Sequence, residues 1–347
     1  MIHEPFGLRP LRSLLGLLLM AGLAPAAEVG DAVPRTGDEI VVCGQLFHTT
    51  TPVVTWMDPG GYDGYRINRR FGPFEESDWD QIKDQLSEPA RYNLRMKGLE
   101  PPLTAEQIEQ VRGGGWSMEQ LQEVVDQFVM HYDVCGTSKV CFKVLHDQRG
   151  LSVHFMLDID GTIYQTLDLK ERAWHATSSN SRSIGIEIAQ IGARSARSRH
   201  QLDEWYEKDD RGMRLTIPSR FGDDLGIRTP DFVGYAAKPE IVVGEIQKTE
   251  LYQYDFTPQQ YEALTKLTAT LCRVFPKLTC QYPADETGRI IADKLPDAQL
   301  RDYHGLLGHY HIQTNKTDPG PAFDWQRVVG GAKRLLYTAG QLDTAGQ

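Results

Sequence analysis

Apolar residues recur at helical and then at strand spacings along the chain after residue 115. Residues 117–128 carry them every three or four positions, behind a capping box formed by Ser117 and Gln120, which predicts a helix. The apolar run then becomes continuous and ends at His131. This predicts a strand whose last residue is a histidine, at a place where a side chain can enter a cleft.

The next apolar patterns predict further strands and a long helix. Residues 152–158 alternate apolar and polar side chains, Asp160-Gly161 is typical of a tight turn, and residues 162–167 return as the partner strand. Residues 183–191 form another strand pattern. Thr257 then begins a helix, with a capping box and a proline in its first turn.

Two segments show a weaker pattern of apolar and polar residues. Residues 27–115 show short strand patterns and a helix start at Thr104, and we interpret them as an extension packed on the main domain. Residues 194–255 are polar and interrupted by Gly and Pro, except for two strand patterns that pair across Lys248-Thr249. This insertion is too long for an ordinary loop. One hypothesis is that it forms a wall of the substrate cleft, and the alternative is a solvated decoration.

The N-terminus has the pattern of an export signal. Arg9 and Arg12 precede an uncharged apolar run, Leu14–Leu23, and small residues follow at Ala24–Ala27. The run is too short to span a bilayer. We therefore expect a signal peptide over residues 1–26, and a mature protein that is exported to the periplasm or the medium, with no transmembrane segment.

Length and charge limit the remaining choices. The expected division is a leader, the extension 27–115, a catalytic domain at 116–335 with the insertion 194–255, and a tail at 336–347. The formal net charge of the whole chain is −10. The leader has a net charge of about +1, so its removal leaves a mature chain near −11. Such a charge argues against a nucleic-acid partner and against simple electrostatic adhesion to an anionic envelope.

Five cysteines remain after the leader. The short spacings favour disulfides between Cys135 and Cys141 and between Cys272 and Cys280, each worth about 2–3 kcal/mol, with Cys43 left over. A cysteine-rich metal site is the alternative, but the chain has no C-x-x-C pair.

Histidines and acids with metal-ligand character occur in two distant stretches. His309 and His311 are two residues apart, so on a strand both would face one side. The ligand set is then His131 and His309 with either His311 or Asp318, because zinc accepts either and a catalytic site needs three protein ligands and a water. Lys316, two residues before Asp318, suits a place where negative charge develops on a substrate oxygen.

Five short motifs identify a resemblance. The chain resembles the type-2 N-acetylmuramoyl-L-alanine amidases, of the superfamily that includes the peptidoglycan recognition proteins. The matching motifs are Ser152–Phe155, Asp160–Gln165, Ala173–Ala176, Ser183–Glu187, and Gly308-His309 with Lys316–Gly320. The resemblance implies a three-layer α/β fold, with a mixed central sheet flanked by helices.

The resemblance also implies roles for single residues. The zinc ligands of the family match His131, His309 and Asp318, and its lysine matches Lys316. Its general base is a tyrosine at the position of Val153 or a glutamate at the position of Glu187, so Glu187 is assigned as the base. The substrate contacts expected from the same motifs are His175, Trp174, His154 and Asn180.

The function that the resemblance implies is zinc-dependent hydrolysis of the amide between N-acetylmuramic acid and L-alanine, in peptidoglycan or in muropeptides. Two alternatives are a non-catalytic peptidoglycan-binding protein on the same scaffold and a zinc peptidase that cuts the stem peptide. The retained set of ligands, base and lysine favours the amidase.

Overall fold

The computed structural model covers the chain from its first residue to its last. It describes Val29, residues 33–65, Tyr92–Asn93, Arg95, Leu99, 101–111 and 115–338, and Gly340. The chain divides into Met1–Arg35 and a compact unit, Thr36–Gln347. The predicted leader therefore falls wholly outside the described residues, as does most of the predicted tail.

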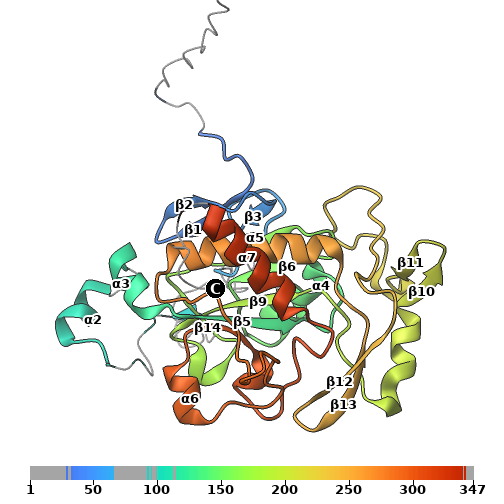
Figure 1. Cartoon of the computed structure of the whole chain (residues 1–347). Coiled ribbons are helices and arrows are strands. Elements are labelled where there is room, and N and C mark those ends of the chain that lie inside the picture. The colour runs from blue at the N-terminus through green and yellow to red at the C-terminus, as the bar shows by residue number, and fades with distance from the viewer. Residues whose placement is uncertain are drawn as a thin grey trace, which may run out of the picture. The chain divides into compact units, whose positions relative to one another are not determined.

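A mixed sheet lies at the centre of the compact unit (Figure 1). Among the described residues it has six strands in the order β14-β5-β9-β6-β7-β3. Strand β9 is parallel to both of its neighbours, and the hairpin of β6 and β7 supplies an antiparallel pair. The strands are β14 (Gly305–Gly308), β5 (Gln127–Tyr132), β9 (Ser183–Ile188), β6 (Phe155–Leu157), β7 (Ile163–Gln165) and β3 (Val53–Thr55).

Alternate side chains of these strands are buried on opposite faces of the sheet. Phe155 and Leu157 belong to the large core cluster that contains the residues of α5 (Pro258–Val274). Met156, between them, belongs to a second cluster with residues of α4 (Ser138–Phe142). Both faces are therefore covered, and the predicted three-layer α/β fold is confirmed.

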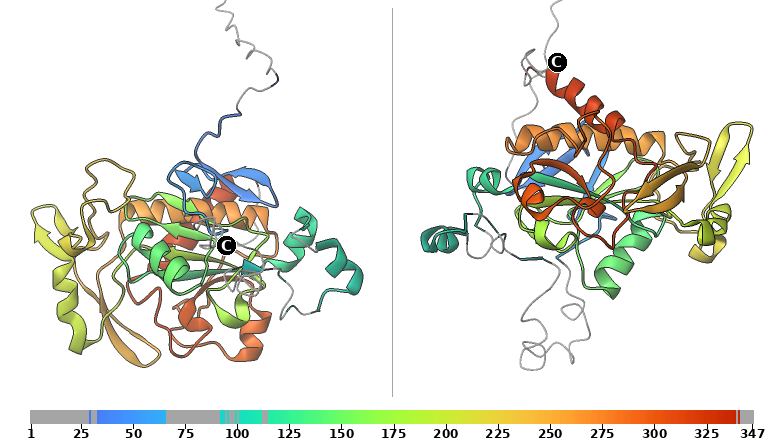
Figure 2. Two further views of the ribbon diagram at one scale, coloured as in Figure 1. Left: turned by 180° about the vertical axis from the view of Figure 1, so that it is seen from behind. Right: turned by 60° about the horizontal axis from the view of Figure 1, so that its bottom comes forward.

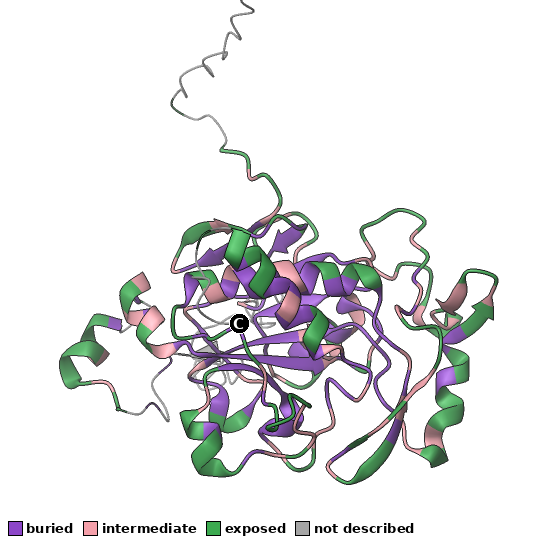
Figure 3. Cartoon of the chain, in the orientation of Figure 1, coloured by how far each residue is buried: buried purple, intermediate pink, exposed green. Residues whose placement is uncertain are grey.

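Helices α5 and α7 (Trp325–Thr338) lie together on one face, and α4 lies on the other (Figures 1 and 2). Helix α4 continues as the π-helix η4 (Lys143–Gln148). Figure 3 shows that buried residues fill the central sheet, whereas the outward faces of the helices are exposed. The amphipathic pattern of α5 arises from this one-sided packing.

The predicted extension contributes to the sheet. Strand β3 pairs in parallel with β7, so residues 53–55 form the sheet edge. The remaining elements of this region are β1 (Glu39–Val42), β2 (Gln45–His48), β4 (Tyr92–Asn93) and α2 (Ala105–Val111). Strands β1 and β2 form a separate hairpin, and β4 pairs with β8 (Arg172–Ala173). The compact unit thus begins well before the predicted boundary at residue 115.

The insertion has short elements of its own. These are η6 (Ala196–Glu204), β10 (Tyr206–Asp209), β11 (Gly212–Leu215), η7 (Ser219–Phe221), β12 (Val242–Ile246) and β13 (Thr249–Gln253). Strands β12 and β13 pair as predicted, although the turn is at Gln247-Lys248, one residue earlier than expected. A small apolar cluster around Trp205 gives this region its own core.

Several local predictions are confirmed. Helices α3 (Met118–Val124) and α5 both begin with a complete capping box, at Ser117 and Thr257. The remaining elements are η5 (Thr177–Ser179), α6 (Asp297–Asp302) and η8 (His309–His311). No described helix is both long and apolar enough to cross a membrane.

Candidate metal centre and active site

Two neighbouring strands place a histidine and a glutamate on the same face of the sheet. His131 of β5 and Glu187 of β9 are partners in the parallel register. Their sequence neighbours Met130, Ile186 and Ile188 point into the core on the α5 side. Because side chains alternate along a strand, His131 and Glu187 face the opposite side.

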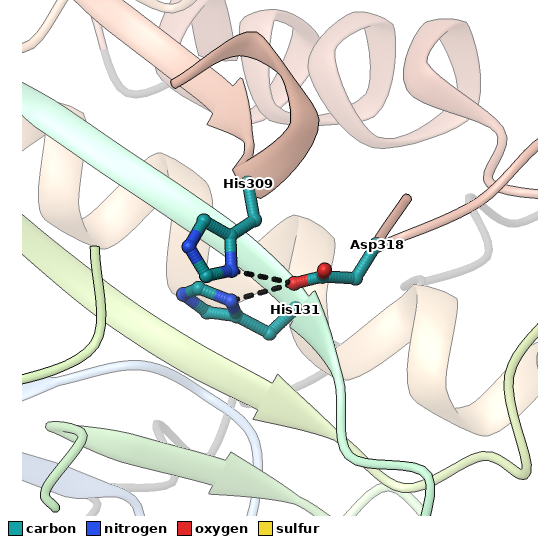
Figure 4. A group of neighbouring side chains, drawn as sticks. All are labelled: His131, His309 and Asp318. Atoms are coloured by element: carbon teal, nitrogen blue, oxygen red, sulfur yellow. Dashed lines mark hydrogen bonds and ion pairs between the residues drawn. The ribbon is translucent and has the colours of Figure 1, made fainter. Parts of the chain in front are cut away.

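His131, His309 and Asp318 converge although they lie far apart in the sequence (Figure 4). Oδ2 of Asp318 is 2.7 Å from Nδ1 of His131 and 3.0 Å from Nδ1 of His309. All three residues are buried. Strand β14 runs parallel to β5, and η8 begins where β14 ends, so His309 arrives beside His131.

The second nitrogen of each imidazole is also engaged. Nε2 of His309 donates to Oε1 of Gln313 at 2.6 Å, and Nε2 of His131 is 3.0 Å from Nδ1 of His175. Such contacts fix the orientation and tautomer of histidines that bind metals. Because Nε2 of His309 contacts Gln313, Nδ1 is the nitrogen of His309 that faces Asp318.

The charges at this centre are mutually dependent. Burial opposes ionisation of Asp318, but the neighbouring His309 and His131 more than compensate, so its pKa lies well below its usual range. Burial, followed by the charge of His309, lowers the pKa of His131 to about 4. Asp318 is therefore a carboxylate, and His131 is mainly neutral at pH 7, which are the protonation states of metal ligands.

This donor set fits a zinc ion. The ligand atoms of the three side chains all lie within 4.8 Å of one another. Two imidazole nitrogens and one carboxylate oxygen form a typical catalytic zinc site, which leaves a position for water.

A cavity of about 780 Å³ opens over this centre. It is large enough for a muropeptide-sized or drug-sized ligand. The functional candidates that line it are His131, Trp174, His175, Asn180, Glu187, His309, Lys316 and Asp318. Eight separately predicted residues thus surround one cavity.

Glu187 is the cavity carboxylate best placed to exchange protons. No hydrogen bond joins its side chain to another described residue, whereas Oδ1 of Asp133 accepts three backbone N–H groups. Burial raises the pKa of Glu187 well above its ordinary value, and the charges of Asp318 and Asp133 add to this effect. A carboxylate in such a place holds a proton more readily than one in water.

The segment after β8 forms another part of the lining. Oδ1 of Asn180 accepts the backbone N–H groups of His175 at 3.1 Å and Ala176 at 2.6 Å, which closes this segment into a turn. The imidazole of His175 lies against Gly185, where a Cβ atom would come within 2.5 Å of the ring. The glycine of the Ser183–Glu187 motif is therefore required for the position of His175.

His154 does not have the predicted role. It is fully buried and is not part of the cavity lining. Its Nδ1 accepts the N–H of Gly185, and its Nε2 donates to the carbonyl of Glu171. His154 therefore stabilises β9 through the backbone of Gly185 and lies outside the cavity where substrate would bind.

His311 does not join the metal centre either. Residues 309–311 form a 3₁₀ turn and not a strand, so His309 and His311 face different directions. Nδ1 of His311 accepts the N–H of Gly308 at 2.8 Å, and its Nε2 donates to the carbonyl of Ile291. Of the two ligand sets that the residue pattern left open, the geometry brings together the one with Asp318.

The structure gives no support to the hypothesis that the insertion forms a cleft wall. None of residues 194–255 lines the cavity. The insertion lies behind it instead: the Trp205 ring packs on Gly136, in the loop after His131.

All five cysteines are free thiols in the structure. The predicted partners are nevertheless neighbours. A hydrogen bond to Cys135, together with burial, raises the pKa of Cys141, and a bond to Cys280 does the same for Cys272. The two disulfides remain predictions.

Sequence reasoning missed two polar residues of the site. Gln313 orients His309, and its spacing of four residues from a histidine is a weak signal. Asp133 ties the loop after β5 to the end of β9 through Cys135, Gly136 and Gln190. The Asp-x-Cys-Gly sequence is compatible with such a turn, because aspartate often accepts backbone N–H groups two residues ahead.

Comparison with protein families finds a match over part of this domain. Residues 121–213 match the model of the N-acetylmuramoyl-L-alanine amidase family. This segment contains His131, His175 and Glu187. The predicted resemblance is confirmed over this segment, which is similar to the type-2 N-acetylmuramoyl-L-alanine amidases, a family of enzymes.

Solved structures that match this chain include AmpD and two N-acetylmuramoyl-L-alanine amidases, all with TM-scores below 0.5. AmpD is 18% identical, with a TM-score of 0.30, over 60% of this chain and 86% of AmpD. The endolysin amidase LysCS from Clostridium intestinale is 16% identical, with a TM-score of 0.33, over 61% and 86%. AmiD from E. coli, in complex with anhydro-N-acetylmuramic acid-L-Ala-D-gamma-Glu-L-Lys, is 17% identical, with a TM-score of 0.33, over 63% and 64%. No curated protein matches the chain.

Proposed function

We propose that this protein is a zinc-dependent amidase that hydrolyses the bond between N-acetylmuramic acid and L-alanine in peptidoglycan or muropeptides. The observation that carries the proposal is the convergence of His131, His309 and Asp318 beside Glu187 in one cavity, within an amidase-family domain. The family match alone stops before His309 and Asp318. The geometry supports the second half of the site.

His131, His309 and Asp318 would hold the metal. A zinc ion bound there supplies a Lewis acid and a water with a pKa lowered to about 7. Gln313 and His175 keep the two imidazoles oriented through their second nitrogens. Asp318 contributes the negative charge that a buried dication needs.

Glu187 moves the proton. Its carboxylate accepts a proton from the attacking water and returns it to the leaving amide nitrogen, so that L-alanine departs as an amine. The pairing of Glu187 with His131 in the register of neighbouring strands supports this role. Val153, at the family's alternative base position, is buried and has no ionisable group.

Lys316 and the segment after β8 act on the substrate. Lys316 lines the cavity two residues before Asp318, where its ammonium group stabilises the negative charge that develops on the carbonyl oxygen. The indole N–H of Trp174, also in the lining, has no acceptor among the described residues. A carbonyl of the bound stem peptide supplies that acceptor.

Mass spectrometry of the products from a defined muropeptide tests the proposed reaction. The amidase gives an intact stem peptide with a free L-alanine amine and a sugar with a free lactyl carboxylate. Shortened stem peptides would instead identify a peptidase. An unchanged substrate that binds the protein would identify a non-catalytic binding protein.

We also propose that the mature protein works outside the cytoplasm. The proposal rests on the sequence pattern of residues 1–26. Sequencing the N-terminus of protein recovered from the producing cells tests it. A start near Ala27 is expected, and an intact Met1 in the recovered protein would contradict it.

A further inference from the structure

The hairpin of β12 and β13 lies against the loop that follows His309. Gln253 of β13 is fully buried, donates to the carbonyl of Pro319 at 3.1 Å and accepts the N–H of Ala322 at 3.0 Å. Gly244 of β12 packs on Pro321, where a Cβ atom would come within 2.7 Å of the ring. The body of the hairpin is thus fixed on the segment that follows Asp318.

The tip of the hairpin reaches the other end of the same loop. Gln247 and Lys248 both have positive φ angles, 51° and 61°, as in the tight turns that match the twist of a hairpin. The backbone N–H of Gln247 donates to the carbonyl of Ala292 at 2.9 Å. The tip is therefore held in place, and its direction is defined.

The side-chain amide of Gln247 binds both ends of one turn. Its Nε2 donates to the carbonyl of Gln313 at 2.6 Å and to that of Lys316 at 3.0 Å. The N–H of Lys316 in turn donates to the carbonyl of Gln313 at 3.3 Å, which closes residues 313–316 as a turn. Thr314 and Asn315, between these ends, are exposed, so the turn has little other support.

This turn carries two groups of the proposed active site. Lys316 lines the cavity, and Gln313 accepts from Nε2 of His309. Gln247 does not line the cavity. Its effect on chemistry must therefore pass through the residues that it holds.

We propose that Gln247, a residue of the insertion, is a positioning residue that sets the place of Lys316 over the reaction centre. The proposal rests on the proposed amidase function. Under this proposal the insertion affects the reaction through Lys316 and does not itself contact the substrate. Removal of the hydrogen bonds that Nε2 of Gln247 donates should lower the transition-state stabilisation that Lys316 supplies and leave substrate binding nearly unchanged.

The experiment is a double-mutant cycle with a matched control. Gln247→Met removes the donor at nearly constant length, and Lys248→Asn changes the exposed neighbour to a residue that tolerates positive φ. We expect Gln247→Met to lower kcat about tenfold with KM within about twofold, and Lys248→Asn to change neither. In a Lys316→Met background, Gln247→Met should change kcat by less than about twofold, because the two residues act as a unit.

Hydrogen exchange gives a readout that does not need activity. The amides of residues 313–318 should exchange faster in Gln247→Met than in the wild type or in Lys248→Asn. If Gln247→Met does not fold, Gln247→Glu, which also lacks the donor, takes its place. Equal losses of kcat with and without Lys316, or unchanged exchange at 313–318, would overturn the proposal. A wild-type protein that releases no stem peptide would instead refute the amidase function.

Discussion

At the residue scale, the metal centre depends on which face of a strand each side chain occupies. His131 and Glu187 share a face because they are register partners in parallel strands. Asp318 joins them from a loop, and its carboxylate contacts both imidazoles. The three proposed ligands and the proposed base therefore come from three separate parts of the sequence.

Substitution of Asp318 distinguishes the two ligand sets that the sequence left open. Asp318→Ala should weaken zinc binding by about a hundredfold or more, because the site loses a ligand and its negative charge. His311→Gln should keep about one zinc per chain, since His311 contacts Gly308 and Ile291 instead. Elemental analysis and zinc titration of both folded variants measure this. Loss of zinc in His311→Gln alone would reverse the assignment.

Substitution of Glu187 tests the general base. Glu187→Gln should lower kcat by about a hundredfold or more while zinc content and KM change little, since the amide keeps the shape of the side chain but cannot accept the proton. Glu245→Gln, at an exposed position on β12, is the matched control. Steady-state kinetics with a defined muropeptide provide the measurement. Near-normal turnover in Glu187→Gln would place the base elsewhere.

The buried His154 makes stability depend on pH. Burial, followed by the charge of Arg95, lowers its pKa to about 3. In the pH range between the ordinary histidine pKa of about 6.5 and the lowered pKa of His154, this side chain binds a proton in the unfolded chain but not in the folded chain. The free energy of unfolding therefore falls as the pH falls, by up to about 1.4 kcal/mol per pH unit.

Urea unfolding between pH 4 and pH 7 measures this effect. His154→Asn should show a smaller loss of stability toward low pH than the wild type, because asparagine does not titrate there. His200→Asn, at an exposed position, should follow the wild type. Identical pH slopes in all three proteins would contradict the account.

The sequence predicted the chemistry of single residues better than their contacts. The convergence of His131, Glu187 and Asp318 at one cavity could be predicted because metal ligands and bases need particular residue types in recognisable motifs. The burial of His154 and the direction of His311 could not, because both depend on packing and on a 3₁₀ turn that no local pattern indicates. The role of Gln247 was missed because it depends on a tertiary contact with Lys316, which no local sequence pattern indicates.

At the element scale, local signals predicted helix starts well and strand lengths poorly. The capping boxes at Ser117 and Thr257 are present because their side chains satisfy the first free N–H groups of each helix. The alternation over 152–158 gave only β6, Phe155–Leu157. Both Val153 and His154 are buried, so alternation there does not separate a core face from a solvent face.

Arg95 links the N-terminal extension to the core under the site. It is fully buried and donates to the carbonyls of Leu169, Ser181 and Ser183 at 2.8–3.1 Å. Burial lowers its pKa to about 9, so it remains charged at pH 7. These carbonyls flank the segment that carries Trp174, His175 and Asn180.

Arg95→Met should therefore destabilise the protein by about 3 kcal/mol or more, since buried carbonyls lose their donors. Arg197→Met, at an exposed position, should change stability by less than about 0.5 kcal/mol. Chemical denaturation measures both values. Equal stability of the two variants would show that the extension does not brace the core through Arg95.

At the scale of the whole molecule, the central sheet brings together strands that lie far apart in the sequence. Strand β3 of the extension pairs with β7, and β14, near the end of the chain, pairs with β5. Periodicity predicts that strands exist, but the order of parallel strands depends on long-range packing. The class of fold was therefore predictable through the family resemblance, whereas the contribution of the extension was not.

The net charge of −10 also acts at this scale. An acidic protein gains no general attraction to an anionic cell wall. Recognition of the wall or its fragments must therefore come from the cavity. The central claim is that three residues of this cavity hold a zinc ion on which hydrolysis depends.

Titration of metal-free protein with zinc tests this claim most directly. The protein is stripped with a chelator, its metal content is checked by elemental analysis, and turnover of a defined muropeptide is measured as zinc is added. We predict that activity is lost with the metal and returns in proportion to added zinc, up to one equivalent per chain. Full turnover by protein shown to contain no metal would contradict the account.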